Sequence, residues 1–207
     1  MDGKILLFGI ILLFFISSRT LDSYSSPQNN IELNHVSSYV DENRIMHVFG
    51  GKILNEYKRS AELRTINPGF VSPFEILFID QKNVDKIKDF KLNVNGTDAR
   101  TQPVDLQIKI DSSRQDILGF YYINGVIFNS GPSSANNSIA IATLYDMDGR
   151  VIAIGRGLAE PKDISSNSGA SFGLAIVDKL QTPKGDRFSV VADSDEYVSK
   201  PTKTKEK

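Results

Sequence analysis

Residue types that could support catalysis are scarce in this chain of 207 residues. There is no Cys, which excludes disulfides, thiolate metal ligands and thiol nucleophiles. The two histidines, His35 and His47, would need convergent partners to support zinc or Ser-His-Asp chemistry. We therefore expect no catalytic residue, no cofactor and no enzyme, with His35 in an exposed loop and His47 in a strand.

Carboxylates offer only weak candidates for metal binding. Asp193, Asp195 and Glu196 cluster near the end of the last predicted strand, where loops of β-sandwiches sometimes bind Ca²⁺. A solvated strand end explains the same cluster. The stretch Asp146-Met147-Asp148-Gly149 resembles a calcium loop, but its Gly falls fourth, whereas an EF-hand loop needs Gly sixth and an acid twelfth. We interpret this stretch as a hairpin turn and predict no metal site.

Three other patterns have a functional and a structural interpretation. Gly155-Arg156-Gly157 could belong to a phosphate loop, but no helix follows it, so a strand bulge is the better interpretation. Tyr121 and Tyr122 could form an aromatic binding face, although adjacent strand residues point to opposite faces, which places one ring in the core. Asn95 and Asn136 begin sequons for N-glycosylation and are predicted to lie in loops.

Net charge excludes several classes of partner. Lys and Arg number 24, Asp and Glu number 25, and the formal net charge is −1. No field of one sign exists to attract nucleic acid or an acidic membrane surface. The hydrophobic fraction of 40% is ordinary for a globular protein, so most of the chain is expected to fold.

The N-terminus carries the features of an export signal. Lys4 precedes the apolar run Ile5 to Ile16. At roughly 12 residues this run suits the core of a signal peptide and is short of the ~20 that span a bilayer. Ser17 and Ser18 could allow cleavage, although retention as a short anchor stays open. Ser17 to Asn30 is Ser- and Asn-rich and is predicted to be a flexible spacer.

Beyond the spacer, alternating apolar residues and turn signals predict short strands and no long helix. The central feature is Ile139 to Tyr145, followed by the turn at 146–149 and a return strand from Arg150 to Leu158. The other predicted strands are Ile45 to Phe49, Phe74 to Phe78, Asp89 to Val94, Asp105 to Asp111, Leu118 to Phe128, Ser171 to Asp178 and Arg187 to Ala192. Gly96 to Pro103 is polar and is interpreted as a linker.

The order of these parts suggests an internal repeat. Gly51 to Asn55 corresponds to Gly125 to Asn129, and Ile66 to Ile76 corresponds to Asn167 to Leu174. The first copy lacks any counterpart of the hairpin at 139–158. Tandem short strands with turn residues between them are typical of immunoglobulin-like sandwiches. A reduced sandwich exposes edges, so the first copy is expected to pack on the second or on a partner.

The second copy resembles an FxLYD domain, a family of immunoglobulin-like β-sandwich modules in exported prokaryotic proteins. The resemblance rests on Asn124 to Asn129, on Leu144, Tyr145, Asp146 and Gly149, and on Gly169 to Phe172. The Phe of the family signature is Ala142 here. The first copy has Asn67-Pro68-Gly69 but no Leu-Tyr-Asp, so it is a degenerate copy. The family motifs are structural, and the resemblance implies a fold and a location more than an activity.

The sequence therefore predicts an all-β protein with two tandem immunoglobulin-like sandwich modules behind a hydrophobic signal segment. Residues 1–30 form the signal or anchor and spacer, 31–95 the reduced module, 104–198 the FxLYD-like module, and 199–207 a disordered basic tail. We expect a non-catalytic interaction or structural module at the cell surface or outside the cell. Its partner would be another cell-envelope protein, with no nucleic acid and with the membrane met only through the N-terminal segment. A protein that binds a small ligand or calcium is the alternative, and a hydrolase is least favoured.

Overall fold

β-Strands form nearly all the regular structure in the computed structural model, which describes residues 5–13, 37–40, 46–49, 57–78 and 91–203. Within these ranges the only helix is the short 3-10 turn η2, Thr182–Lys184. The strands are β1 Ile5–Leu13, β2 Ser37–Val40, β3 Met46–Phe49, β4 Tyr57–Arg59, β5 Ile76–Phe78, β6 Lys91–Ala99, β7 Leu106–Gln115, β8 Tyr121–Asn129, β9 Ile139–Tyr145, β10 Val151–Glu160, β11 Ser168–Ile176, β12 Arg187–Asp193 and β13 Thr202–Lys203. The predicted all-β class is confirmed.

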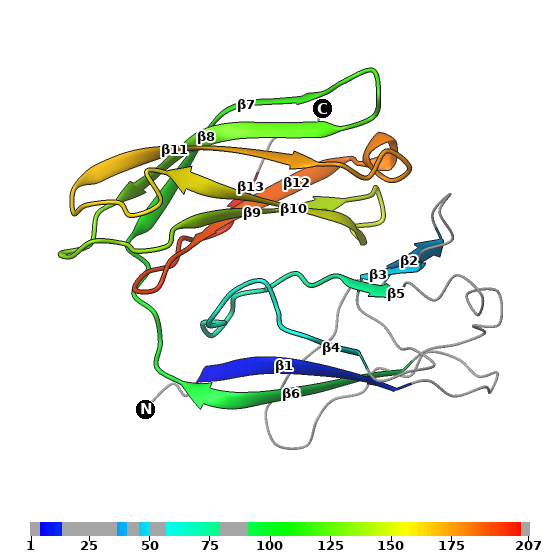
Figure 1. Cartoon of the computed structure of the whole chain (residues 1–207), viewed down its shortest axis with the longest axis horizontal. Coiled ribbons are helices and arrows are strands. Elements are labelled where there is room, and N and C mark those ends of the chain that lie inside the picture. The colour runs from blue at the N-terminus through cyan, green and yellow to red at the C-terminus, as the bar shows by residue number, and fades with distance from the viewer. Residues whose placement is uncertain (1–4, 14–36, 41–45, 50–56, 79–90, 204–207) are drawn as a thin grey trace.

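Most of the strands belong to one antiparallel sheet of seven, in the order β13-β12-β9-β10-β11-β8-β7. β10 and β11 pair at only two positions, Ala159 with Phe172 and Glu160 with Ser171. The sheet turns at this narrow junction, so that β7, β8 and β11 form one layer over β9, β10 and β12 (Figure 1). A backbone bridge between Leu106 and Ser199 joins the two ends, and the sheet is nearly closed.

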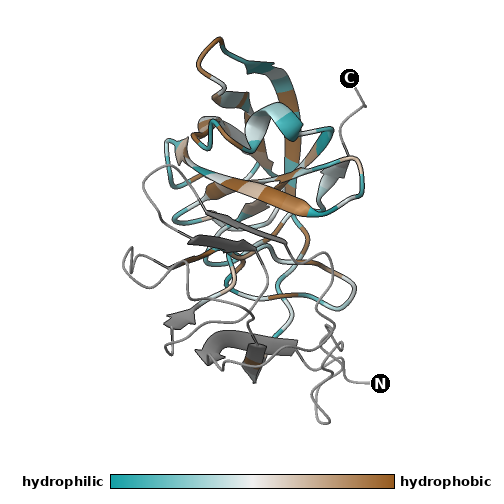
Figure 2. Cartoon of the chain, turned by 90° about the vertical axis from the view of Figure 1, so that its right-hand side faces the viewer, coloured by the Kyte–Doolittle hydropathy of each residue, from teal (hydrophilic) through white to brown (hydrophobic). Residues whose placement is uncertain are grey.

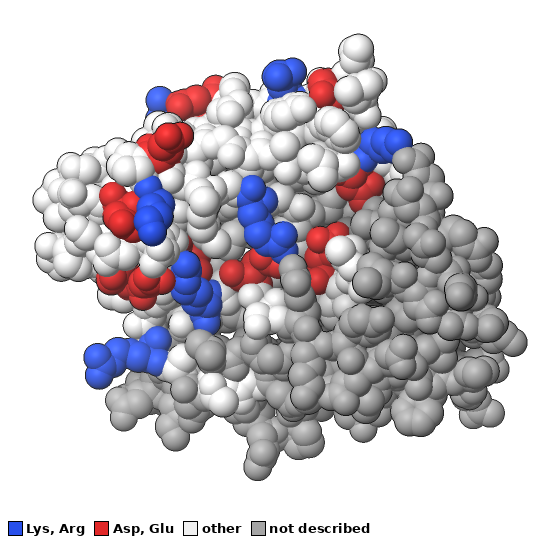
Figure 3. All heavy atoms as spheres, viewed as in Figure 1, with Lys and Arg blue, Asp and Glu red and all other residues white. Residues whose placement is uncertain are grey.

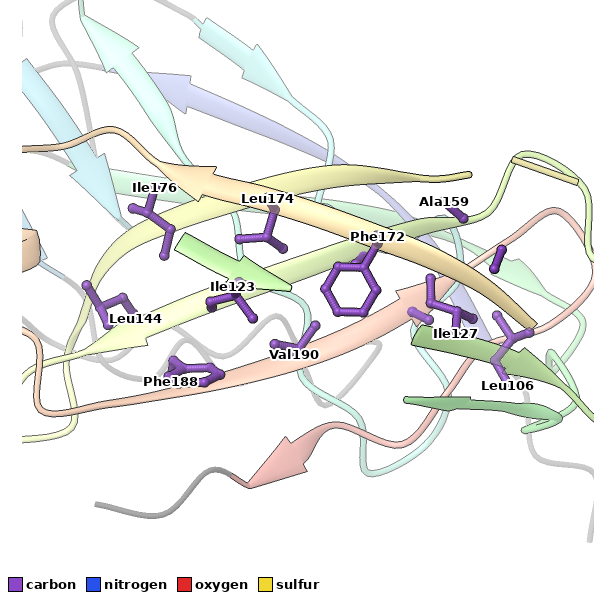
Figure 4. Close-up of a cluster of buried hydrophobic side chains, with 14 of the residues drawn as sticks. Leu106, Ile123, Ile127, Leu144, Ala159, Phe172, Leu174, Ile176, Phe188 and Val190 are labelled. Atoms are coloured by element: carbon purple, nitrogen blue, oxygen red, sulfur yellow. The ribbon is translucent and has the colours of Figure 1, made fainter. Parts of the chain in front are cut away.

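The core lies between these two layers and follows the alternation of each strand. Ile123 and Ile127 on β8 face Leu144 on β9 and Val190 on β12, and all four are at most 1% exposed (Figure 4). Tyr121 packs edge to face on Phe188, with ring centroids 5.7 Å apart. Each such side chain contributes about 1.5–3 kcal/mol when it is buried, which compensates for the absence of disulfides. Figure 2 shows the apolar stretches concentrated in the strands of the sandwich.

Gly155 and Gly157 lie where β10 runs close against β11. A Cβ at Gly157 would be 2.5 Å from the carbonyl oxygen of Gly173, and a Cβ at Gly155 would be 2.7 Å from Cγ1 of Ile176. The predicted bulge is not at these glycines, because the pairing of β9 with β10 is regular from Ala153 to Leu158. The irregularity falls earlier, between Val151 and Ala153. The glycines are required by close packing instead.

Residues 60–73 cover the outer face of the sandwich. Leu63 is 3% exposed and packs in a second apolar cluster with Ile141 of β9 and Val191 of β12. The predicted turn at Asn67-Pro68-Gly69 is present and is closed by a hydrogen bond from the Phe70 N–H to the Asn67 carbonyl at 2.9 Å. Residues 60–73, which belong to the first predicted module, therefore pack on the second predicted module. This is one of the two arrangements expected for a module with exposed edges.

Two further sheets are built from the N-terminal half. β1 is the central strand of the order β4-β1-β6, and its pairing with β6 runs from Ile5 with Ala99 to Leu13 with Lys91. The other sheet has the order β2-β3-β5. The described residues of these sheets do not form a second sandwich of the kind seen at 106–203. Among the described residues, no helix is long and apolar enough to cross a membrane.

The structure differs from the predicted domain ends at two places. β6 continues to Ala99, so the start of the predicted linker is paired backbone, and Gln102 is buried against Asn67. The predicted disordered tail is ordered over residues 199–203. Ser199 is 1% exposed and Thr202 pairs with Val190 of β12. Composition missed this pairing, because a short edge strand needs backbone groups and no apolar side chain.

Candidate interaction site

The Leu-Tyr-Asp motif forms the corner of the β9–β10 hairpin. Oδ1 of Asp146 accepts hydrogen bonds from the N–H groups of Asp148 at 3.0 Å and Arg150 at 2.8 Å. The N–H of Gly149 donates to the Asp146 carbonyl at 2.9 Å, and Gly149 has a φ of 78°, which a residue without Cβ adopts freely. The hairpin turn predicted at 146–149 is confirmed. Asp146 acts here as a turn residue.

The other two motif residues fix this corner to the sandwich. Leu144 is 1% exposed and lies so close to Gly185 that a Cβ there would be 2.8 Å from the Leu144 methyl groups. Tyr145 is half-buried, and the Arg187 guanidinium lies 5.6 Å from its ring centroid. Its hydroxyl is 3.3 Å from Oγ of Ser189. The motif thus connects the hairpin to the loop that leads into β12.

Three loops meet at this end of the sandwich: residues 116–120, 146–150 and 177–186. The strand register requires it, because Gln115 is opposite Tyr121, Tyr121 is opposite Ile176, and Tyr145 is opposite Arg187. The first and third loops are in contact, since the Thr182 hydroxyl donates to the Gly119 carbonyl. Figure 1 shows the β7–β8 turn and the loop after β11 together at the right-hand end of the sandwich.

Exposed aliphatic side chains are concentrated on these loops. Ile117 is 101% exposed, Met147 84% and Val177 67%. Leu118 and Leu180 are also exposed, at 63% and 39%. We call these five residues the apolar loop end. Large apolar residues that gather on one surface mark interaction sites more often than isolated ones do.

Aspartates also hold the backbone of the other two loops, 116–120 and 177–186. Oδ1 of Asp116 accepts from the N–H groups of Leu118 and Phe120, both at 2.9 Å. Oδ1 of Asp178 accepts from Leu180 and Gln181, both at 3.1 Å. Burial raises the pKa of Asp178, against the effect of these N–H donors. Because the carboxylates satisfy the turn N–H groups, the apolar side chains are presented on ordered backbone.

Charges of both signs surround the sandwich. Figure 3 shows Lys and Arg interleaved with Asp and Glu over the face it draws. At the loop end, Arg150 pairs with Asp146 at 3.1 Å and also with Asp148. Arg114 stacks on Tyr122, 4.7 Å from the ring centroid. Tyr121 is buried and Tyr122 half-buried, so the two adjacent rings point to different environments, as predicted.

The two edge strands of the large sheet, β7 and β13, are poorly suited to pair with a further strand. β7 carries a bulge between Ile110 and Ser112, and Lys109, Asp111 and Arg114 are exposed along it. The opposite edge, β13, has only two residues. Bulges, charges and short edge strands all discourage pairing with a further strand.

The three carboxylates that were weak candidates for calcium binding, those of Asp193, Asp195 and Glu196, lie at the other end of the sandwich. Each of them is already bound by a positively charged or N–H group of the protein. Asp193 and Asp195 both bind Arg64, at 2.9 and 3.3 Å. Glu196 accepts from the N–H and the side-chain amide of Asn136, at 2.7 and 2.6 Å. In the described part of the chain, no group of three or more His, Cys, Asp and Glu is arranged to hold a metal ion.

The sequon residues and the histidines contribute nothing to this site. Asn136 lies in a turn as predicted, but its amide is bound to Glu196 and the sequon's Ser138 is fully buried. Asn95 lies within β6, opposite Gly9, and not in a loop. Strand pairing there was missed because Asn-Gly is also a strong turn signal. His47 lies in β3 as predicted, and His35 lies outside the described residues.

No protein-family model matches the chain, and no curated protein or solved structure matches it.

Proposed function

We propose that the protein is a non-catalytic interaction module that binds a protein partner through the apolar loop end. The observation that carries this is that Ile117, Met147 and Val177, all more than 60% exposed, lie on three loops at the same end of the sandwich. Burying such side chains against a partner is favourable by about 1.5–3 kcal/mol each. Loops on a rigid sandwich are a common place for such sites.

Loops are favoured over sheet edges as the contact surface. Both mechanisms follow from a β-sandwich, and an edge would bind by adding a strand. The bulge after Ile110 and the charges on β7 oppose strand addition. At the loop end, the backbone donors are already satisfied by Asp116, Asp146 and Asp178. The free energy available there comes from side chains.

We propose further that the protein is exported and acts at the cell surface with another cell-envelope protein. The apolar run from Ile5 to Ile16 supports export, with cleavage after it or retention as an anchor as the two outcomes. The FxLYD resemblance supports the same location and an immunoglobulin-like assignment of the sandwich. It rests on Leu144, Tyr145, Asp146 and Gly149.

The test is site-specific photo-cross-linking in intact cells with a tagged full-length chain. A photoreactive residue at Ile117 or Met147 is compared with one at Leu158, which is equally apolar and 67% exposed but lies on β10. One dominant envelope protein captured from both loop positions and not from the strand position supports the proposal. Equal capture from all three positions, or none from the loops, contradicts it.

A matched pair of variants measures the contribution of the surface. Ile117→Ser combined with Met147→Ser should abolish capture at a probe placed on Val177, while Leu158→Ser leaves it unchanged. Thermal melting of each variant serves as the folding control, since exposed substitutions usually change stability by less than about 0.5 kcal/mol. Capture that survives the double substitution with the fold intact would assign the contact to another surface.

A further inference from the structure

Acidic and basic residues at the loop end differ in how far they reach into solvent. Residues 114–120, 146–150 and 177–187 contain five basic and five acidic residues, so their formal charges cancel. All of the basic residues are exposed: Arg114, Arg150, Lys179, Lys184 and Arg187. Four of the acidic residues are half-buried: Asp116, Asp146, Asp178 and Asp186. The balanced net charge therefore hides a separation of the two signs, with the cations outermost.

The half-buried carboxylates are turned toward the backbone of their own loops. Oδ1 of Asp116, Asp146 and Asp178 each accepts hydrogen bonds from two turn N–H groups. The one exposed acidic residue, Asp148, pairs with Arg150. Because a charged acceptor forms strong hydrogen bonds with N–H groups, these carboxylates serve the fold and not the outer surface.

Three of the exposed cations contact uncharged groups. The guanidinium of Arg114 lies 4.7 Å from the ring centroid of Tyr122, and that of Arg187 lies 5.6 Å from the ring centroid of Tyr145. Nζ of Lys184 is 3.4 Å from Oε1 of the Gln181 amide. Within the described part of the chain, none of these three cations forms an ion pair with a carboxylate. Their charges are therefore available to a partner.

The same three cations lie beside the apolar side chains of the loops. Arg114 lies on β7 two residues before the β7–β8 loop, and Lys184 lies in the loop after β11. Arg187 is the first residue of β12 and is opposite Tyr145, the last residue of β9 before the turn that carries Met147. We call Arg114, Lys184 and Arg187 the basic rim. The loop end thus combines exposed aliphatic side chains with exposed positive charge.

This combination restricts the partners that fit. Protein interfaces commonly have an apolar centre and a polar rim, and the charges of the two rims are complementary. A partner that covers Ile117 and Met147 brings its own rim against the exposed cations. Opposite charge there accelerates association, and like charge opposes it.

We propose that the partner of the apolar loop end is a protein surface with an apolar centre and an acidic rim, recognised through Arg114, Lys184 and Arg187. This inference rests on the proposed function, since it names the class of partner for the same surface. Its basis is charge complementarity: the cations are exposed, whereas most of the carboxylates of these loops are turned inward.

The first test needs no identified partner and uses the full-length wild-type protein. Octanoate and octyltrimethylammonium have the same apolar chain and opposite charges, and both are added below the concentration at which they form micelles. The amide NMR signals of Ile117, Met147 and Val177 report their binding. Octanoate should reach half of its shift at a concentration about threefold lower than the cation, which is the effect expected of exposed charge pairs. Equal midpoints, or a lower midpoint for the cation, would overturn the acidic rim.

A matched pair of variants assigns the preference to the rim. Lys184→Gln combined with Arg187→Gln should remove most of the preference for octanoate. Lys109→Gln combined with Lys200→Gln removes the same charge from exposed positions outside the loop end and should retain the preference. Thermal melting of both variants is the folding control. A preference that survives the first pair and falls with the second would refute the assignment.

The second test separates this inference from the proposed function. Photo-cross-linking from Met147 in intact cells is repeated with Lys184→Glu combined with Arg187→Glu, and capture of the protein partner should fall at least about threefold. Undiminished capture would overturn the acidic rim and leave the proposed function standing. Absence of capture by the wild type, with octanoate still preferred, would overturn the proposed function and keep the basic rim as an anion-selective surface. Binding of the wild type to vesicles of phosphatidylcholine and phosphatidylglycerol, with no protein captured, would place an anionic membrane at this surface and overturn the protein partner.

Discussion

Oδ1 of Asp146 accepts a hydrogen bond from the backbone N–H of Arg150 at 2.8 Å, across the turn that joins β9 to β10. The same pair is closed on the other side by the Asp146 N–H, which donates to the Arg150 carbonyl at 3.0 Å. One residue thus satisfies both backbone groups of Arg150. The aspartate of the Leu-Tyr-Asp motif fixes where the hairpin turns, and with it the position of Met147.

Replacing Asp146 with Ala should destabilise the fold by about 1–2 kcal/mol, because two turn N–H groups lose a charged acceptor. The control is Asp148→Ala. Asp148 is 68% exposed and its carboxylate pairs with Arg150 at the surface, so its loss should cost less than about 0.5 kcal/mol. Urea denaturation followed by circular dichroism measures both. Equal midpoints for the two variants would show that the turn does not depend on Asp146.

The close approach of β10 and β11 predicts a contrast between two glycines. In Gly157→Ala the new Cβ would meet backbone, 2.5 Å from the Gly173 carbonyl oxygen, so a cost of about 1–3 kcal/mol is expected. In Gly173→Ala the nearest atom is Oδ1 of the exposed Asn124 at 3.1 Å, which can move away. Thermal melting should therefore drop clearly more for the first variant. A larger drop for Gly173→Ala would contradict this packing.

Calcium should leave the melting temperature unchanged. A ligand stabilises the folded state only if it binds there, by an amount that grows with its concentration relative to Kd. Asp193, Asp195 and Glu196 already hold Arg64 and Asn136. Melting with millimolar CaCl₂ and with EDTA should therefore coincide. A rise with CaCl₂ that Glu196→Gln abolishes would revive the calcium-binding alternative.

Strand positions in the second half of the chain could be predicted from the sequence alone. Ile139 to Tyr145 matches β9 at both ends, because apolar residues, a turn signal and a returning strand all agree there. Arg187 to Ala192 differs from β12 by a single residue at its end. Leu118 was predicted to begin the strand that corresponds to β8, but it belongs to the turn before that strand, since Asp116 accepts its N–H. A hydrogen bond from a turn N–H to a side chain cannot be predicted from the alternation of apolar and polar residues.

The loop end could be predicted only in outline. The sequence indicated loops at one end of a sandwich, but which loops meet depends on register, as in the opposition of Tyr145 and Arg187. The exposure of Ile117 and Met147 could not be predicted from the sequence either, because an apolar residue is expected in the core unless other evidence places it at the surface. Long-range pairs such as Arg64 with Asp193 join parts of the chain that no local pattern connects.

Leu63→Ala tests whether residues 60–73 are an integral part of the sandwich. Leu63 is 3% exposed and packs on Ile141 and Val191, so truncation should cost about 2–5 kcal/mol. If the segment and the sandwich unfold together, the NMR methyl signals of Ile127, in the other apolar cluster, will report the full loss in urea. The control Val71→Ala, at a 72% exposed position of the same segment, should leave the midpoint within about 0.5 kcal/mol of the wild type. An unchanged Ile127 transition in Leu63→Ala, with altered signals confined to residues 60–73, would mean that the segment detaches before the sandwich unfolds.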